Sequence, residues 1–144
     1  MNGSIRQVGL LTLLTVSVCM SGCGKGQQSV RSVEGKVTVN GQPATGALIM
    51  LHPVEDKEPG IFPNATVEPD GSFRLTTYKL NDGAPEGEYF ATIVWEETYR
   101  EDGETLSKGD KLKGKYGNKE ASGLKVTIKK GKNTLPAFDL AMDK

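Results

Sequence analysis

The segment 33–43 has the sequence VEGKVTVNGQP, and its pattern indicates how the chain folds. Valines recur at odd-numbered positions, so an extended strand places them on one face and turns polar side chains to the other. An Asn-Gly pair follows at 40–41, and both residue types adopt the positive φ that a type I′ turn requires. The segment therefore predicts a strand over 33–39 that folds back towards a strand over 47–52. The valines that share the predicted buried face are Val33, Val37 and Val39.

The same two-residue alternation recurs along the chain between turn signals. The further candidate strands cover residues 47–52, 65–68, 72–78, 88–95, 124–128 and a last strand that ends at 138–140. An Asp-Gly pair at 70–71 predicts another tight turn, and no stretch after residue 33 has the 3.6-residue period of an amphipathic helix. Seven strands in about 110 residues are typical of a sandwich. We therefore expect an all-β fold, a seven-stranded antiparallel β-sandwich with Greek-key connections.

The first 22 residues predict a secretory signal peptide. Arg6 is the only charged side chain among the first 24 residues, and residues 8–20 are mostly Leu, Val and Thr. A short apolar run behind a weakly positive start is typical of such a signal. A membrane-spanning helix is the weaker alternative, because it needs about 20 predominantly apolar residues.

Residues 20–23, Met-Ser-Gly-Cys, resemble the lipobox of bacterial lipoproteins, although Met20 stands where that family most often has Leu. The resemblance implies that the signal over 1–22 is removed and that Cys23 is acylated and becomes the first mature residue. The alternative is an ordinary or disulfide-bonded Cys23, whose candidate partner Cys19 lies inside the removed segment. A glycine directly after the lipidated cysteine, here Gly24, resembles lipoproteins that travel to the outer membrane. We therefore expect the chain to be located in the outer membrane.

The mature chain divides into a short leader and one domain. Residues 23–32 carry little that a core could bury, so we expect a lipidated, flexible tether. The remaining residues, 33–144, are one domain's worth of length.

Residues 96–121 have no clear period, and loops of this length are usually functional or disordered. Five acidic side chains come first in this stretch and five lysines follow. This order predicts a long, solvated hairpin that turns about residues 103–109, with an acidic arm facing a basic one. Exposed ion pairs of this kind contribute only about 0 to 1 kcal/mol each. Leu112 and Tyr116 are expected to fix the return of this stretch to the sandwich.

A series of turn and strand residues occurs in a distinctive order: Gly35, Val37, Val39, Asn40, Gly41, Pro43, Gly46, Ala47, Asp70, Gly71, Phe73, Leu75, Gly87 and Tyr89. Their order and spacing resemble the carboxypeptidase regulatory-like, or transthyretin-like, domain. The carboxyl-terminal part, with Lys115, Tyr116, Ser122, Leu124, Val126, Gly131, Asn133 and Phe138 to Leu140, is similar to small bacterial lipoproteins that carry this one domain. The resemblance implies a transthyretin (prealbumin)-like topology and an accessory module without a catalytic centre. Tyr89 is similar to a tyrosine corner, whose hydroxyl bonds nearby backbone.

Composition argues against most site chemistries. With 18 basic and 18 acidic side chains the net charge is zero, which argues against nucleic acid and anionic lipid headgroups as partners. His52 and Glu55 have the His-x-x-Glu spacing of zinc carboxypeptidases, but a catalytic zinc needs three protein ligands and the chain has one histidine. Asp82, Glu86 and Glu88 offer oxygens to calcium, yet nothing matches an EF-hand loop, so a polar turn is favoured. No serine lies in a nucleophile elbow. We expect no metal, no cofactor and no enzymatic activity.

Two functions of different classes remain. The first is a membrane-anchored, non-enzymatic structural or protein-interaction module of the cell envelope, whose partners are the membrane, through the lipid on Cys23, and an envelope protein. The alternative is a glycan-binding surface module, in which exposed aromatic faces stack on sugar rings. The aromatic candidates for that role are Trp95, Tyr99, Tyr78 and Tyr116. Trp95 shares a predicted strand face with Ile93 and Tyr89, which favours a core position. A solvent-facing aromatic row would favour glycan binding.

Overall fold

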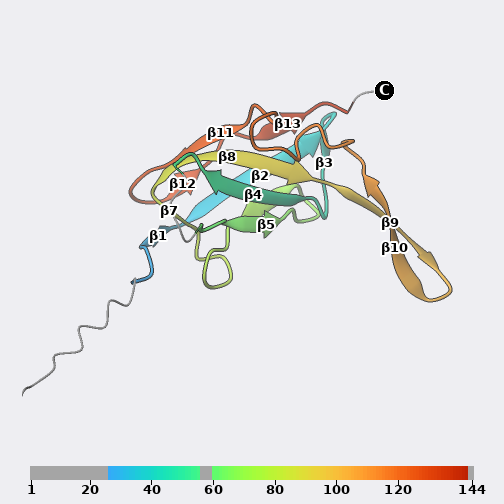
Figure 1. Ribbon diagram of the computed structural model, residues 1–144, viewed down its shortest axis with the longest axis horizontal. Coiled ribbons are helices and arrows are strands. Elements are labelled where there is room, and N and C mark those ends of the chain that lie inside the picture. The colour runs from blue at the N-terminus through green and yellow to red at the C-terminus, as the bar shows by residue number, and fades with distance from the viewer. Residues whose placement is uncertain (1–25, 56–59, 143–144) are drawn as a thin grey trace, which may run out of the picture.

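The computed structural model describes residues 26–55 and 60–142, and every regular element within them is a β-strand (Figure 1). The all-β prediction is therefore confirmed. Two larger sheets contribute side chains to one hydrophobic core, as in a β-sandwich. The described residues include no helix that is long and apolar enough to span a bilayer. The predicted signal peptide over 1–22 and Cys23 lie outside the described residues.

The first sheet has four antiparallel strands in the order β11-β8-β4-β5. Their bounds are β4 (Leu48–Pro53), β5 (Asn64–Thr66), β8 (Gly87–Val94) and β11 (Lys125–Ile128). The alternation of the sequence decides which face is buried, because successive side chains of a strand point to opposite sides. In β8, Tyr89, Ala91 and Ile93 are at most 4% exposed, as the pattern predicts.

The second sheet is built around one long central strand, β2 (Val33–Val39). The shorter strands beside it are β3 (Gln42–Pro43), β6 (Ser72–Arg74), β12 (Asn133–Thr134) and β13 (Phe138–Leu140). β6 and β3 pair antiparallel with β2, whereas β12 and β13 pair parallel with it. The prediction of a wholly antiparallel sandwich is therefore wrong. After β11 the chain crosses to the second sheet beside Val33, at the start of β2, and so runs in the same direction as β2.

The turn at Asn40 and Gly41 forms as predicted, with φ values of 50° and 77°. It returns the chain to β3 alone, which pairs with the last two residues of β2. The predicted return of strand 33–39 onto strand 47–52 is wrong, because β4 belongs to the other sheet. The chain passes between the sheets at Ala44 and Ala47, both 0% exposed.

An aromatic pair fills the core beneath β2. The rings of Phe73 and Phe138 have centroids 6.2 Å apart and planes inclined by 25°. Gly35, between the core valines of β2, leaves the space that the Phe73 ring occupies. A Cβ atom at Gly35 would lie 2.6 Å from Cζ of Phe73, so no larger residue fits there without moving the ring.

Tyr89 is a tyrosine corner in the sense that the sequence predicts. Its buried hydroxyl donates a hydrogen bond of 2.9 Å to the carbonyl oxygen of Pro85. Pro85 belongs to β7 (Ala84–Pro85), which pairs with β1 (Val30–Arg31). Residues 30–31 of the segment 23–32, which the sequence predicts to be a flexible tether, therefore form a strand, because their backbone pairs with β7.

Residues 96–110 form a two-stranded hairpin that projects from one end of the sandwich (Figure 1). We call this hairpin the arm; its strands are β9 (Glu96–Glu101) and β10 (Glu104–Asp110). Its turn is at Asp102 and Gly103, whose φ values are 51° and 85°. The predicted turn about 103–109 is therefore too late in the chain. The acidic residues are distributed over the two strands instead of forming one acidic strand.

Candidate functional site

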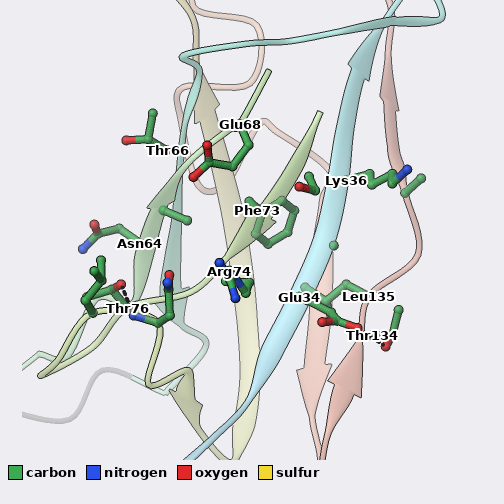
Figure 2. Close-up of a pocket in the computed structure, with 16 residues that line it drawn as sticks. Glu34, Lys36, Asn64, Thr66, Glu68, Phe73, Arg74, Thr76, Thr134 and Leu135 are labelled. Carbon is green, nitrogen blue, oxygen red and sulfur yellow. Dashed lines mark hydrogen bonds between the residues drawn. The ribbon is translucent and has the colours of Figure 1, made fainter. Parts of the chain in front are cut away.

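The described surface contains a hollow of about 780 Å³, shown in Figure 2. Its walls come from β2 and β6, from β5 and from the segment between β12 and β13, and they combine polar and apolar side chains. The charged lining residues are Glu34, Lys36, Glu68 and Arg74, with the polar Asn64 and Thr66 on the β5 side. We call this hollow the groove.

The groove exists because β5 and β6 begin as a hairpin and then join different sheets. The hairpin is closed at one end by paired backbone bonds between Asn64 and Thr76, of 3.0 and 2.8 Å, and at the other end by the bond from Glu68 N to Ser72 O, of 2.8 Å. Between these closures lie Thr66 and Arg74, both described by the structure, and no backbone hydrogen bond joins them.

Antiparallel pairing alternates between bonded and non-bonded residue pairs. Leu51 N bonds Pro63 O and Val67 N bonds Ala47 O, so Thr66 falls at a non-bonded position against β4. The same alternation puts Arg74 at a non-bonded position against β2. The backbone N–H and C=O groups of Thr66 and Arg74 therefore face the gap between the two strands, where they are available to a ligand.

The charges of the groove are only partly paired. Glu34 accepts an ion pair of 2.9 Å from Lys132 and a hydrogen bond of 3.2 Å from the Thr134 hydroxyl. The Lys132 contact is the main cause that holds the pKa of Glu34 below its ordinary value. Within the described residues, Lys36, Glu68 and Arg74 take part in no ion pair or side-chain hydrogen bond. All three are exposed.

The arm is the second candidate site. Its residues 96–108 carry five carboxylates against two cations, Arg100 and Lys108, a net charge of −3. Tyr99 and Leu106 lie directly opposite each other across the two strands. Tyr99 is 38% exposed, and the Lys108 ammonium lies 5.4 Å from its ring centroid and 3.3 Å from Glu97. The arm thus presents an apolar pair within an acidic surface.

The base of the arm is held by Asp110 and Trp95. The Asp110 carboxylate accepts backbone N–H bonds from Trp95, Leu112 and Gly114 at 2.9, 3.0 and 2.8 Å. The indole Nε1 of Trp95 donates to the Thr45 carbonyl at 2.9 Å. Leu112 is 3% exposed. Leu112 therefore fixes the return of the chain to the sandwich, as predicted, and the half-buried Tyr116 packs against the same core.

The four aromatic residues proposed for sugar stacking do not form a row. Tyr78 accepts a bond from Gln28 N and lies close enough to Tyr89, near the start of β8, for its charge to add to burial in raising the pKa of Tyr89, whereas Trp95 follows the end of β8. At about 3.3 Å per residue, the extended chain from Tyr89 to Trp95 spans about 20 Å. Trp95 is half-buried, with the Lys111 ammonium 4.2 Å from its ring centroid. The core position favoured for Trp95 is therefore only partly realised.

The remaining candidate ligands have other partners. His52 Nε2 lies 2.9 Å from the Thr92 hydroxyl, and burial, followed by the charge of Lys119, lowers its pKa. No three His, Cys, Asp or Glu side chains gather within the described residues in a way that could hold a metal. Asp82 accepts backbone bonds from Thr77, Tyr78 and Lys79 at 2.7 to 3.0 Å.

These contacts make Asp82 a turn-forming residue. Burial alone would raise its pKa, but the hydrogen bonds to its carboxylate outweigh burial and lower the pKa. Glu86, which was paired with it as a possible calcium ligand, instead binds Arg31 at 2.6 Å. Sequence reasoning missed the groove altogether, because Thr66 and Arg74 carry no motif and meet only through the divergence of their strands.

Comparison with known proteins adds little. No protein-family model matches the chain, and no curated protein matches it. One similar solved structure is a "putative carbohydrate binding protein" from Pseudomonas aeruginosa, with a TM-score of 0.41 and 15% identity over 81% of this chain and 90% of that one. Another is a 9R-lipoxygenase from Cyanothece, with a TM-score of 0.42 and 9% identity over 78% of this chain and 16% of that one. Both TM-scores lie below 0.5, so neither likeness assigns a topology or a function.

Proposed function

We propose that this chain is a lipid-anchored lipoprotein of the bacterial cell envelope, whose β-sandwich is a non-enzymatic module that contacts another protein through the arm. The observation that carries the proposal is the placement of β1 and the arm at opposite ends of the longest axis of the described chain (Figure 1). An anchor ahead of β1 would hold that end at the membrane and present the arm on the far side.

The anchor rests on the resemblance of residues 20–23 to a lipobox. An N-acyl diacylglyceryl cysteine carries more than the single chain that gives only marginal membrane binding. Residues 24–29, between Cys23 and β1, reach at most about 20 Å when fully extended. The β1 end would therefore lie close to the bilayer, and Gly24 favours the outer membrane as its location.

The arm supports a contact function because it is poorly suited to a structural one. An isolated two-stranded hairpin is marginally stable in water, and every residue of β9 is exposed. β9 and β10 pair only with each other among the described residues, so the outer edge of each strand is open. Open edges accept a strand from a second protein. The charge of −3 over residues 96–108 favours a partner with a basic surface.

The finer fold belongs to the same proposal. Two sheets around one core and the tyrosine corner at Tyr89 support a transthyretin-like accessory domain. The single histidine supports a non-catalytic role. Its Nε2 lies 2.9 Å from the hydroxyl of Thr92, a residue that is only 7% exposed.

The anchor is tested by feeding cells labelled palmitate. The native chain should incorporate the label and Cys23→Ser should not. An unlabelled native chain, purified from the membrane fraction or from the medium, would contradict the anchor. The contact proposed for the arm is tested separately.

The arm is tested by placing a photo-reactive phenylalanine analogue at Tyr99 in intact cells. A discrete protein adduct is expected from this position and none from Thr127, an exposed residue of β11 that serves as the matched control. Replacement of residues 98–108 by an Asn-Gly turn, or the charge reversal Glu101→Lys, should abolish the adduct made by a neighbouring probe at Glu97. Equal adducts at Tyr99 and Thr127 would refute a specific contact by the arm.

A further inference from the structure

The groove has the composition of a site for a polar organic ligand. Two of its polar side chains are partly engaged within the fold, because Asn64 Nδ2 donates to the Phe62 carbonyl and the Thr76 hydroxyl accepts from Asn81 N. Its volume of about 780 Å³ lies within the range of small-molecule sites. Hydroxyl and amide groups of Thr66, Asn64 and Thr76 line the β5 side, as Figure 2 shows. Ala65, Ala137 and Leu135 add apolar surface to the lining.

The free charges of the groove select the kind of ligand. Because Lys132 pairs with Glu34, the lining groups that form no ion pair within 4 Å in the described chain are two cations, Lys36 and Arg74, and one carboxylate, Glu68. Their sum is +1. At longer range the charge of Arg74 acts on Glu34 and that of Lys36 acts on Asp70. Such a lining attracts one carboxylate, since a guanidinium binds carboxylate oxygens in a fork geometry. It does not suit a polyanion, because the carboxylates of Glu68 and Glu34 also line the groove.

The strand edges argue against a peptide as the occupant. A peptide that adds to a sheet needs a continuous row of free backbone groups. On the edge of β6 that faces the groove, Ser72 and Thr76 on either side are already bonded to Glu68 and Asn64, which leaves only the single step at Thr66 and Arg74. A ligand with many hydroxyls and few backbone amides uses such an isolated pair of donors and acceptors better than an extended chain does.

We propose that the groove binds a saccharide that carries a carboxylate, such as a uronic acid unit. Arg74 and Lys36 hold the carboxylate, Glu68 and Asn64 bond hydroxyl groups, and the backbone of Thr66 and Arg74 supplies further polar contacts. This site is independent of the four aromatic candidates, none of which lines the groove, and it goes beyond the protein contact proposed for the arm. It requires neither the arm nor the anchor.

The test is a calorimetric titration of the full-length lipoprotein in detergent with three probes: glucuronosyl-xylotriose, which carries one carboxylate, neutral xylotetraose, and an end-blocked Gly-Glu-Gly peptide, which also carries one carboxylate. The glucuronosyl saccharide should bind, and xylotetraose should bind at least about tenfold more weakly, the factor expected from losing a charge-assisted hydrogen bond. The peptide should also bind more weakly, because it lacks the hydroxyl groups of the saccharide. Arg74→Ala should weaken binding of the glucuronosyl saccharide by about tenfold. Arg100→Ala, an equally exposed arginine on the arm, is the matched control and should leave the affinity unchanged.

Three outcomes would overturn the proposal. They are no binding of the glucuronosyl saccharide, an affinity for the peptide equal to that for the glucuronosyl saccharide, and binding that Arg74→Ala leaves intact. Arg74 is exposed and makes no side-chain hydrogen bond within the described chain, so the variant should fold, and an unchanged thermal midpoint verifies this. Loss of the arm adduct with retained saccharide binding would refute only the contact function.

Discussion

Gly83→Ala should release β1 from the sandwich. Gly83 has a φ of +101°, and a Cβ atom there would lie 1.7 Å from the carbonyl oxygen of Arg31 and 2.5 Å from its carbonyl carbon. Both atoms belong to backbone that pairs with β7, so no side-chain rotation can relieve the contact. We expect Val30 and Arg31 to separate from β7 and become exposed.

The magnitude has two parts. An alanine in the left-handed region costs about 1 to 2 kcal/mol, and overpacking against fixed neighbours costs typically about 1 to 3 kcal/mol. The free energy of unfolding should therefore fall by about 2 to 5 kcal/mol. Gly131→Ala is the matched control, because Gly131 has a φ of +94° and no atom within 4 Å of the added Cβ. The control should show the first part alone.

Urea denaturation of both variants measures this difference, and hydrogen exchange of the amides of Arg31 and Ala84, which face each other across β1 and β7, reports where it arises. Gly83→Ala should be the less stable variant by about 1 to 3 kcal/mol and should lose protection at those amides. If the two variants were equally stable, or if Arg31 and Ala84 stayed protected, the close approach of Gly83 to β1 would not be a packing constraint.

Three further outcomes follow from buried groups. Tyr89→Phe leaves the Pro85 carbonyl without its donor, so urea denaturation should show a loss of about 1 to 3 kcal/mol, and a neutral result would count against the tyrosine corner. Phe73→Ala should cost about 3 to 5 kcal/mol in the same assay, and a smaller effect than that of Tyr89→Phe would contradict its place at the centre of the core. Burial, with Lys119, lowers the pKa of His52 in the folded protein, so the unfolded chain takes up the proton first; the free energy of unfolding should fall as pH drops from 6.5 towards the lower folded value. His52→Gln should remove that slope, and a slope that persists would assign it to other groups.

Local patterns in the sequence predicted local structure well. The alternating valines of β2 are at most 4% exposed, and the turn at Asn40 and Gly41 has the positive φ values that the residue types favour. The hydroxyl of Tyr89 finds backbone four residues upstream. Each of these outcomes depends on residues that are close in the chain, where side-chain period and turn chemistry decide the geometry.

Pairing between distant segments was less predictable, for physical reasons. The alternation in β4 fixes which side chains are buried but not which sheet the strand joins, and the same holds for β13. The arm lacks a hydrophobic period because it has no buried face, so the order of its charges predicted a hairpin but nothing in residues 96–110 marked where its strands begin and end. The groove depends on the separation of two strands between Thr66 and Arg74. This separation is a feature of the topology, and neither residue type predicts it.

The parallel pairing of β13 with β2 also means that the second sheet can close only after the last strand has been synthesised. Thr38 and Asp139 share a side-chain hydrogen bond although they are 101 positions apart. At about 5 to 20 residues per second, a ribosome needs on the order of 5 to 20 s to make the intervening chain. Through that interval the valines of β2 have no permanent neighbour on one edge. A newborn chain is thus exposed to premature association, and a chaperone that shields its first long strand would be most useful before the last strand emerges.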